Sequence, residues 1–326
     1  GLAYPFFLLI NLLFFLYWMI RGRRKLMLSL IVILIGYQPL VMHVQILPGR
    51  EAPLDGTMKI LSYNVQNMAH SNVGIEAAEI RSGILTFIGS QKADIACIQE
   101  FSARGSDFEG VFEEMKSLTH YTYCYYENYN PKKLYRIDAM VILSNYPAAG
   151  TNTLTIPGEY HHFGLYADLV DQKDTFRVYN LHLESVRLQH EDYQFVEDIS
   201  KGQTEKGTLE EGSKSILRKL HYAFKIRAKQ TAVVVESLAE CPYPVIICGD
   251  FNDTPLSYAY RKISDGLDDA FVDAGHGLGN TFAGKLPPLF RIDFILYSPA
   301  FRSFEFNVHK IPLSDHYPVT VFLERE

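Results

Sequence analysis

Two long uncharged stretches at the N-terminus constrain what this chain can fold into more than any other feature. Residues 2–20 and 26–47 contain no charged side chain, and the loop between them, residues 21–25, reads Arg-Gly-Arg-Arg-Lys. Stretches of 19 and 22 residues are long enough to cross ~30 Å of hydrocarbon as helices. We therefore predict that residues 1–47 form a transmembrane helical hairpin, with a pair of buried core helices as the alternative.

The basic loop also predicts the orientation of this hairpin. Lys and Arg residues beside membrane helices stay on the cytoplasmic side, so we expect the remainder of the chain on the extracytoplasmic side. A signal peptide is the competing interpretation of residues 2–20, but here the basic residues follow the apolar segment instead of preceding it. The chain starts at Gly1 and not at Met, which leaves a fragment, a processed form and an upstream span open.

The rest of the chain is acidic. From Arg50 onward 27 basic residues face 37 acidic ones, a net charge of −10, whereas a duplex-DNA binder ordinarily carries the opposite sign. With 48 % hydrophobic and 21 % charged residues overall, a disordered chain is excluded. Two local basic runs are interpreted either as phosphate contacts or, because apolar residues interleave them, as solvated faces. They are Lys132, Lys133 and Arg136, and Lys219, Lys225, Arg227 and Lys229.

Four cysteines show no spacing typical of a metal site. Cys97 and Cys248 fall within apolar, strand-like runs, which predicts buried free thiols. We assign no disulfide among the four cysteines, and their disulfide status stays open because an extracytoplasmic location would permit one.

Beyond a linker at residues 48–57, short apolar runs alternate with helical patterns. Many strands and few helices favour an α+β layered sandwich over a doubly wound parallel sheet. Residues 197–214 are rich in Gly, Lys, Glu, Ser and Thr and are predicted to be a mobile surface insertion, a solvated loop in preference to a substrate lid. The tyrosines between residues 121 and 129 indicate a half-exposed strand.

The element boundaries follow from these patterns. Predicted strands span residues 59–65, 94–99, 139–144, 165–170, 176–183, 245–248, 290–297 and 318–323. Predicted helices span residues 74–91, 108–118 and 213–239. The last helix is expected to dock on a sheet through residues spaced three or four apart, namely Leu217, Leu220, Phe224, Thr231, Val235 and Leu238.

Polar residues stand at the ends of several predicted strands, where loops can bring them together. A carboxylate inside the apolar run around Asp293 is costly to bury unless it has a partner. The segments are Ser62-Tyr63-Asn64-Val65, Ile98-Gln99-Glu100, Asn180-Leu181-His182-Leu183-Glu184-Ser185, Gly249-Asp250-Phe251-Asn252, Arg291-Ile292-Asp293-Phe294-Ile295 and Ser314-Asp315-His316.

These residue types suit the hydrolysis of a phosphoester. Such a reaction needs a hard cation to neutralise the phosphate, and Mg²⁺ prefers one or two carboxylates plus water, a role that Glu100 can fill. The attacking water must be oriented and deprotonated, for which Asp250 and His316 are suited. Asp293 can hold the His316 ring in one tautomer.

Hydrogen-bond donors for the non-bridging phosphate oxygens are also present, in Asn64, Asn252 and His182. Each motif alone is weak, because Gly-Asp-Phe-Asn is equally typical of a turn, Asn64 of a strand-end cap and His182 of a core histidine. The ordered set carries the hypothesis of a catalytic site.

The order of the set resembles the endonuclease/exonuclease/phosphatase superfamily, whose fold is called DNase I-like. The resemblance covers roughly residues 58–325, so that residues 58–326 are expected to be one catalytic domain. It implies a four-layer α/β sandwich with two central mixed β-sheets flanked by helices, and a site for Mg²⁺ or Mn²⁺ at one end. The residues that carry it are Asn64, Glu100, His182, Asp250 with Asn252, Asp293, and Asp315 with His316.

The resemblance also implies roles. Glu100 would be the main metal ligand with Asn64 beside it, and Asp315 a supporting or alternative metal residue. Asp250 and Asn252 would position or activate the water and the phosphate. His316, oriented by Asp293, would contact the phosphate or act as acid and base. His182 occupies a position that is Tyr in exonuclease III-type branches. Arg136, Asn64 and Asn252 would contact the substrate.

We therefore expect a membrane-tethered, Mg²⁺- or Mn²⁺-dependent phosphoesterase that attacks a phosphodiester or phosphomonoester with an activated water. The tether makes phospholipid headgroups or their soluble phosphodiester products plausible substrates. A tethered nuclease acting on DNA or RNA is the nearest alternative among enzymes, and the choice between the two stays open. A catalytically silent membrane-anchored scaffold is the alternative of another class. No protein partner is predicted.

Overall fold

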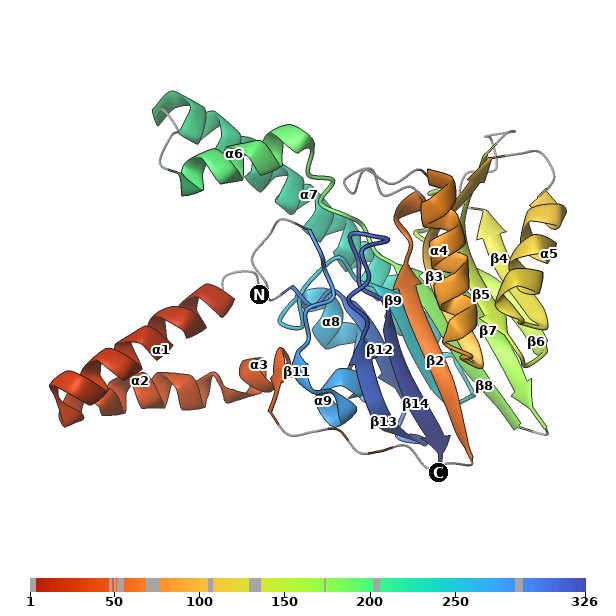
Figure 1. Cartoon of the computed structure of the whole chain (residues 1–326), viewed down its shortest axis with the longest axis horizontal. Coiled ribbons are helices and arrows are strands. Elements are labelled where there is room, and N and C mark those ends of the chain that lie inside the picture. Colours follow the sequence, from red (N-terminus) through yellow and green to blue (C-terminus); the bar gives the residue numbers. More distant parts are fainter. Residues whose placement is uncertain are drawn as a thin grey trace.

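Two β-sheets lie face to face with helices on both outer sides (Figure 1). This computed structural model describes residues 4–46, 49, 51, 56–68, 77–104, 108–128, 136–172, 174–201, 206–284 and 290–326. One sheet, here the β8–β9 sheet, has the spatial order β10 (Asp268–Asp269), β12 (Asp293–Tyr297), β9 (Val245–Asp250), β8 (Asp174–His182), β7 (His162–Asp171) and β6 (Ala148–Thr155). The other, the β2–β3 sheet, has the order β13 (Phe301–Val308), β14 (Val319–Arg325), β2 (Thr57–Asn64), β3 (Ile95–Arg104), β5 (Arg136–Ser144) and β4 (Tyr123–Asn128).

Both sheets are mixed, because β2 pairs with β3 and β8 pairs with β9 in parallel whereas their other neighbours are antiparallel. The prediction of two mixed sheets flanked by helices is therefore confirmed. Each predicted strand has its counterpart here. The strands β6 and β13, and the two-residue strands β1 (Val44–Gln45), β10 and β11 (Gly277–Leu278), were not predicted.

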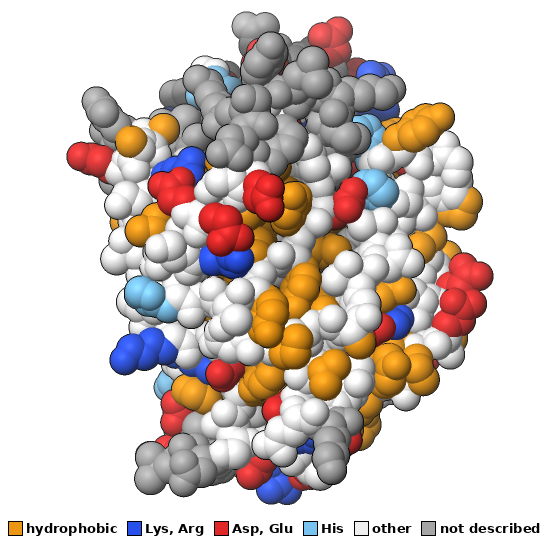
Figure 2. All heavy atoms as spheres, turned by 90° about the vertical axis from the view of Figure 1, so that its right-hand side faces the viewer, with side chains coloured by type: hydrophobic (Ala, Val, Ile, Leu, Met, Phe, Trp, Pro, Cys, Tyr) orange, Lys and Arg blue, Asp and Glu red, His pale blue; other side chains and the backbone are white. Residues whose placement is uncertain are grey.

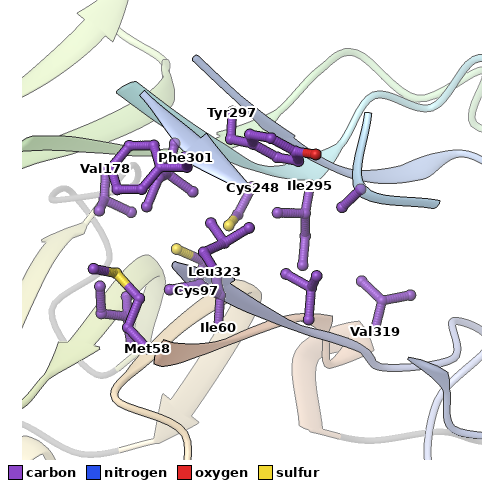
Figure 3. Close-up of a cluster of buried hydrophobic side chains, with 14 of the residues drawn as sticks. Met58, Ile60, Cys97, Val178, Cys248, Ile295, Tyr297, Phe301, Val319 and Leu323 are labelled. Atoms are coloured by element: carbon purple, nitrogen blue, oxygen red, sulfur yellow. The ribbon is translucent and has the colours of Figure 1, made fainter. Parts of the chain in front are cut away.

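The core between the sheets is apolar (Figure 3). Ile60 and Cys97 from the β2–β3 sheet pack against Val178, Cys248 and Ile295 from the β8–β9 sheet. Cys97 and Cys248 are fully buried free thiols whose sulfurs point toward each other, and burial raises the pKa of the Cys97 thiol well above its ordinary value. The prediction of two buried thiols is confirmed.

Helices cover the outer face of each sheet. The β2–β3 sheet packs under α4 (Ala77–Ser90) and α5 (Phe108–Thr119), and the β8–β9 sheet packs under α7 (Lys206–Ala239) and α8 (Tyr258–Ile263). In β9, Ile246 and Cys248 face the other sheet while Val245 and Ile247 face the helices. Strands buried on both faces read as continuous apolar runs, which is why they were recognisable in the sequence.

The side of the molecule on which β4 and β6 end the two sheets is mixed in character. Figure 2 shows apolar side chains along the middle of this face, with charges of both signs scattered around them. Tyr123 and Tyr125 of β4 are partly buried and Tyr126 is exposed, so the predicted half-exposed strand is confirmed. Residue 129 and the predicted basic residues Lys132 and Lys133 lie outside the described residues.

The N-terminal residues form a helical hairpin that projects from the sandwich (Figure 1). It consists of α1 (Tyr4–Arg21) and α2 (Arg23–Ile35), joined at Gly22. The short helix α3 (Tyr37–Val41) follows, and β1 (Val44–Gln45) pairs with β11 (Gly277–Leu278), which ties the hairpin to the sandwich. In the part of the chain described here, no helix combines the length and the apolar character that crossing a membrane requires.

The prediction of one helix over residues 26–47 is wrong. α2 ends at Ile35, where Gly36 is its C-cap, and Pro39 lacks a backbone donor within α3. Of the predicted linker at 48–57, residues 48, 50 and 52–55 lie outside the described residues, as do residues 74–76 of a predicted helix.

The predicted surface insertion at residues 197–214 is helical instead. α6 (His190–Ser200) begins with a capping box between Gln189 and Asp192, and α7 follows. The two helices pack closely, because a Cβ added at Gly212 would lie 2.4 Å from the Phe195 ring. Residues 202–205 between them lie outside the described residues. Polar composition therefore concealed two helices that support each other.

The predicted docking face of α7 is also partly wrong. Ala223, Arg227, Gln230, Thr231 and Val234 are buried against the sandwich. Leu217 and Phe224, which were expected to dock, are 64 % and 43 % exposed, and Val235 is exposed as well. An arginine and a glutamine occupy the buried stripe, where an apolar pattern was expected.

Candidate active site

The site lies at one end of the space between the two sheets. Side chains alternate between the two faces of a strand, so in β9 the residue after Ile246 and Cys248 on the inner face is Asp250. The same alternation applies to the ends of the neighbouring strands. The side chains that it brings to the inner face are Asn64, Gln99, Asn180, His182, Asp250 and Asp293.

Strand register places three of these side by side. His182 pairs with Asp250 across the parallel β8–β9 ladder, and Asp250 pairs with Asp293 across the antiparallel β9–β12 ladder. The approach is close at Gly249, where an added Cβ would lie 2.1 Å from the carbonyl oxygen of Leu181. Only glycine fits there, and it precedes the central carboxylate.

Glu100 reaches the same space through an irregularity in β3. The register between β3 and β5 shifts between Ile98 and Phe101, and Glu100 has a φ of 52°. Plain alternation would send Glu100 to the opposite face from Gln99, whereas a β-bulge redirects a side chain. Its carboxylate accepts hydrogen bonds from Asn64 Nδ2 (3.2 Å) and from Asn67 Nδ2 (3.3 Å).

Amide side chains join the two sheets at this end. Asn64 Nδ2 also donates to Asp250 Oδ2 (3.0 Å), and Asn252 donates to Asp250 through its backbone N–H (2.7 Å) and its Nδ2 (3.0 Å). One layer deeper, the fully buried Gln99 Nε2 donates to Asn180 Oδ1 (2.7 Å). These bonds set the spacing between Glu100 on one sheet and Asp250 on the other.

The structure brings the predicted histidine–aspartate pair together. His316 Nδ1 lies 3.0 Å and 3.1 Å from the two oxygens of Asp293, and its Nε2 lies 3.7 Å from Asp250 Oδ2. Ser314 Oγ donates to the backbone oxygen of Asn64 (2.8 Å) and accepts from the His316 N–H (3.1 Å), so the histidine loop is fastened to the end of β2.

Charges in this buried space perturb each other. His182 Nε2 lies 3.2 Å from Glu100 Oε1 and 3.7 Å from Asp250 Oδ2. Burial opposes both charged forms, yet the hydrogen bond and charge of His182 lower the pKa of Glu100 to about 2, and Glu100 in turn raises the pKa of His182. Each of the two groups therefore stabilises the charged form of the other.

The pKa values of a second pair, Asp250 and His316, are shifted as well. Burial raises the pKa of Asp250 to about 6; His316 opposes this rise, while the nearby Asp293 adds to it. Burial disfavours the imidazolium of His316, but Asp293 and Asp250 outweigh it and hold its pKa well above the ordinary value. Paired groups whose environments shift their pKa values are typical of acid–base sites.

The donor set fits a hard divalent cation. Among the described residues, Asp250, Asp293 and His316 offer ligand atoms that all lie within 4.8 Å of one another. Asn64 bridges this group to Glu100, which adds a third carboxylate at the same place. Carboxylate and amide oxygens are the ligands that Mg²⁺ takes in proteins, so the residues present suit the cation predicted from the sequence.

The predicted metal set of Glu100, Asn64 and Asp315 is only partly the set that the structure gathers. Glu100 and Asn64 adjoin the cluster, whereas Asp250 and Asp293, expected as catalytic residues, lie within ligand range. Asp315 is half-buried, accepts from Ser314 Oγ (3.4 Å) and contributes to the raised pKa of His316. It acts on the site through its charge.

Arg136 contacts the site indirectly, through Asn67. Its Nε donates to Asp138 Oδ1 (2.6 Å) and its Nη2 to Asn67 Oδ1 (3.1 Å), and Asn67 bonds Glu100. Sequence reasoning missed Asn67, and a signal for it was present: it follows the Ser62-Tyr63-Asn64-Val65 motif by two residues. Its φ of 58° is a conformation that asparagine tolerates better than most residues.

Arg227 was also missed as a site residue. It is 2 % exposed, and its Nη1 donates to the carbonyl oxygens of Glu184 (2.9 Å) and Asn252 (2.7 Å), while Nη2 lies 3.2 Å from Asp253. It thereby joins the loop after β8 to the loop after β9. The signal was its place in a buried helical stripe, four residues after Ala223 and three before Gln230.

Arg227→Ala is expected to lower the free energy of unfolding by about 3 kcal/mol, since removing one partner of a buried ion pair leaves Asp253 buried without its counter-charge. Urea denaturation of the purified chain measures this loss. Arg261→Ala, at an exposed position of α8, is the control and should change stability little. Equal stability of the two variants would contradict the structural role of Arg227.

Comparison with known proteins agrees with this geometry. The Endonuclease/Exonuclease/phosphatase family profile matches residues 61–316, and a domain of unknown function (DUF8431) matches residues 1–42. A search of curated proteins found no relative.

Solved structures resemble the chain at low sequence identity, which shows a shared fold alone. A conserved protein of unknown function from Enterococcus faecalis V583 is 18 % identical, with 82 % of this chain and 100 % of that one covered and a TM-score of 0.61. The human Nocturnin catalytic domain with bound sulfate is 14 % identical, with coverages of 86 % and 100 % and a TM-score of 0.60. The Bacteroides thetaiotaomicron mannosyl-6-phosphatase Bt3783 is 18 % identical, with coverages of 82 % and 99 % and a TM-score of 0.54.

The profile match runs from β2 to the His316 loop and includes every residue of the cluster described above. Since it covers more than half of the chain, the chain belongs to the Endonuclease/Exonuclease/phosphatase family.

Proposed function

We propose that this chain is a divalent-metal-dependent phosphoesterase that hydrolyses a phosphate ester by attack of an activated water. The observation that carries the proposal is the buried cluster of three carboxylates and two imidazoles at one end of the two sheets, linked through Asn64. Like charges are costly to bury together unless a cation or a proton compensates them.

Each residue of the cluster has its own role in the proposed reaction. Asp250, held by Asn64 and Asn252 and with a pKa raised toward the neutral range, accepts the proton of the attacking water. His316, oriented by Asp293, carries a proton that it donates toward the phosphate or the leaving oxygen. Glu100 and its neighbours would hold a divalent cation, which would supply charge neutralisation at the phosphate.

We also propose that α1 and α2 hold the protein at a bilayer. Apolar side chains on both helices are exposed in an amount that is unusual for a soluble surface. They include Phe7, Leu9, Leu13, Ile20, Leu28, Leu34 and Ile35. With the basic turn at residues 21–25 on the cytoplasmic side, the catalytic domain would lie on the extracytoplasmic side.

The substrate class follows from this placement. A phospholipid headgroup is within reach of a domain tied to the hairpin by the β1–β11 pair, and the acidic net charge of the domain disfavours long nucleic acids. Phosphate-type chemistry occurs in structural neighbours, since one is a mannosyl-6-phosphatase and another binds a sulfate.

Purified full-length protein in detergent tests the proposal. We expect hydrolysis of bis-(p-nitrophenyl) phosphate with Mg²⁺ or Mn²⁺ and its loss in EDTA, and phospholipids, DNA and RNA assayed in parallel give the substrate class. Turnover that persists after metal removal and dialysis contradicts the mechanism. A folded protein that binds metal without turnover on any of these substrates favours the scaffold alternative.

Glu100→Gln is expected to weaken metal affinity by about 10-fold or more, because one anionic ligand becomes neutral while the side chain keeps its shape. Titration calorimetry with Mn²⁺ measures the affinity. Glu113→Gln, on the exposed face of α5, is the matched control. Unchanged affinity in Glu100→Gln would assign the ion to the Asp250, Asp293 and His316 group alone.

A further inference from the structure

The exposed face of α7 carries a pattern that neither the fold nor the site uses. Residues 212–235 contain six basic side chains and no acidic one, in a chain whose formal net charge is −6. Three of the six are accounted for, since Lys214 pairs with Glu210, Lys219 pairs with Asp192, and Arg227 is buried at the site. Arg218, Lys225 and Lys229 are exposed, and none forms an ion pair with a residue that the structure describes.

An apolar stripe runs beside these charges. Leu217, His221 and Phe224 follow one another at steps of four and three residues, which places them on one side of the helix. Arg218, Lys225 and Lys229 follow at steps of seven and four, on the adjacent side. Helices that lie in a membrane interface combine a basic stripe with exposed Leu and Phe in this way.

The position of α7 agrees with such a contact. α6 and the N-terminal part of α7 extend beyond the sandwich on the same side as the α1–α2 hairpin, away from α4 and α5 (Figure 1). α6 braces α7 through the contact of Phe195 with Gly212 and through the ion pair of Lys219 with Asp192. A basic and partly apolar helix thus projects on the same side of the molecule as the hairpin, although the two diverge in this view (Figure 1).

We propose that this face of α7, formed by Leu217, Arg218, His221, Phe224, Lys225 and Lys229, binds the surface of an anionic phospholipid bilayer. The negative headgroups pair with the three unpaired basic residues, and Leu217 and Phe224 enter the boundary between headgroups and acyl chains. The face is separate from the hairpin, whose own basic residues are confined to its turn at residues 21–25.

The same helix also holds two loops of the candidate site. Arg227 and Gln230, on the opposite side of the same helix, hold the loop after β8 through the carbonyl and the N–H of Glu184. Arg227 holds the loop after β9 as well, through the carbonyl of Asn252. A bilayer bound to α7 therefore lies against the helix whose opposite side holds the loops that follow His182 and Asp250.

This inference extends the proposed membrane association, and vesicles separate the two. Protein comprising residues 1–326 is mixed with phosphatidylcholine vesicles, or with vesicles containing phosphatidylglycerol as well, and the bound fraction is measured by flotation at low and high salt. Binding to neutral vesicles reports the hairpin. The additional affinity for anionic vesicles has contributions from the basic turn at residues 21–25 and from α7, and substitutions in α7 isolate the second contribution. If the protein does not bind neutral vesicles, the hairpin proposal is contradicted, and the comparison on anionic vesicles still tests the α7 proposal.

The triple variant Arg218→Gln, Lys225→Gln and Lys229→Gln is expected to lower the additional affinity by about 10²-fold, with hydrolysis of a small soluble phosphodiester unchanged. The matched control Lys92→Gln, Lys262→Gln and Lys310→Gln removes the same charge from exposed positions outside α7 and should retain the additional affinity. Equal affinity of the two triple variants for anionic vesicles would overturn the proposal.

A second readout detects insertion directly. Trp18 is the single tryptophan, so Leu217→Trp in a Trp18→Phe background reports on α7 alone. Quenching by brominated acyl chains in anionic vesicles supports the proposal, and the absence of quenching overturns it. If the triple variant loses affinity for single-stranded DNA but keeps its additional affinity for anionic vesicles, the face binds nucleic acid and the lipid proposal is wrong.

Discussion

Replacing Asp250 by Ala should lower kcat/KM for any substrate of this protein by at least about 10², while the protein stays folded. Asp250 lies at the centre of the site. It accepts hydrogen bonds from Asn64 on the other sheet and from Asn252 on its own loop, and it stands between His182 and Asp293 in the strand register. Removing it takes away the proton acceptor and the link between the sheets.

The measurement is steady-state hydrolysis at saturating Mg²⁺, with circular dichroism to confirm the fold. Asp265→Ala, at an exposed position after α8, is the control and should keep full activity. Asp250→Asn adds a distinction, because it preserves the size of the side chain but cannot accept the proton. Full activity of Asp250→Asn would remove Asp250 from the acid–base role.

His316→Ala is expected to lower kcat by about 10² or more, and Asp293→Asn to lower it for the same reason. Asp293 contacts His316 Nδ1 with both of its oxygens, so it sets the orientation and the charge of the ring. If Asp293 acts through the ring, then Asp293→Asn adds little in a His316→Ala background. Residues that act as a unit show this kind of non-additivity.

A double-mutant cycle with kcat as the readout checks this coupling. Mn²⁺ affinity measured on the same four proteins separates orientation of the ring from ligation of the ion, since Asp293 is also within ligand range. Fully additive losses with a large fall in metal affinity for Asp293→Asn would make Asp293 a ligand instead of a partner of His316.

The sequence predicted much of the site because simple alternation governs it. Asn64, His182 and Asp250 each end a buried strand after an apolar run, and Asp293 begins the buried strand β12. Strand period two carries all four to the same inner face. The two-sided burial of these strands made the runs conspicuous. The residues brought together are therefore those that the motifs named, and their catalytic roles stay predictions until measured.

Features that alternation does not describe were harder to predict. Glu100 was expected in the site, but the bulge and the positive φ that bring it there were not predicted, because neither has a signal in local residue pattern. Arg227 was passed over because a buried arginine depends on carbonyls from two distant loops. The helices within residues 197–214 were missed because the prediction relied on composition, which does not reveal that Phe195 packs on Gly212.

The hairpin shows a further limit of the sequence. Absence of charge predicted one helix over residues 26–47, but Gly36 and Pro39 act on the backbone irrespective of hydropathy. Hydropathy alone therefore located the apolar segment and misplaced its end.

The bond from Ser314 Oγ to the backbone of Asn64 spans 250 residues of sequence. At about 5–20 residues per second, a ribosome needs on the order of 10–50 s to synthesise the chain between these two residues. Throughout that interval the residues that precede Ser314 in the site lack His316, so the cluster of carboxylates and imidazoles is incomplete. The candidate site can therefore assemble only after residue 316 has left the exit tunnel and docked.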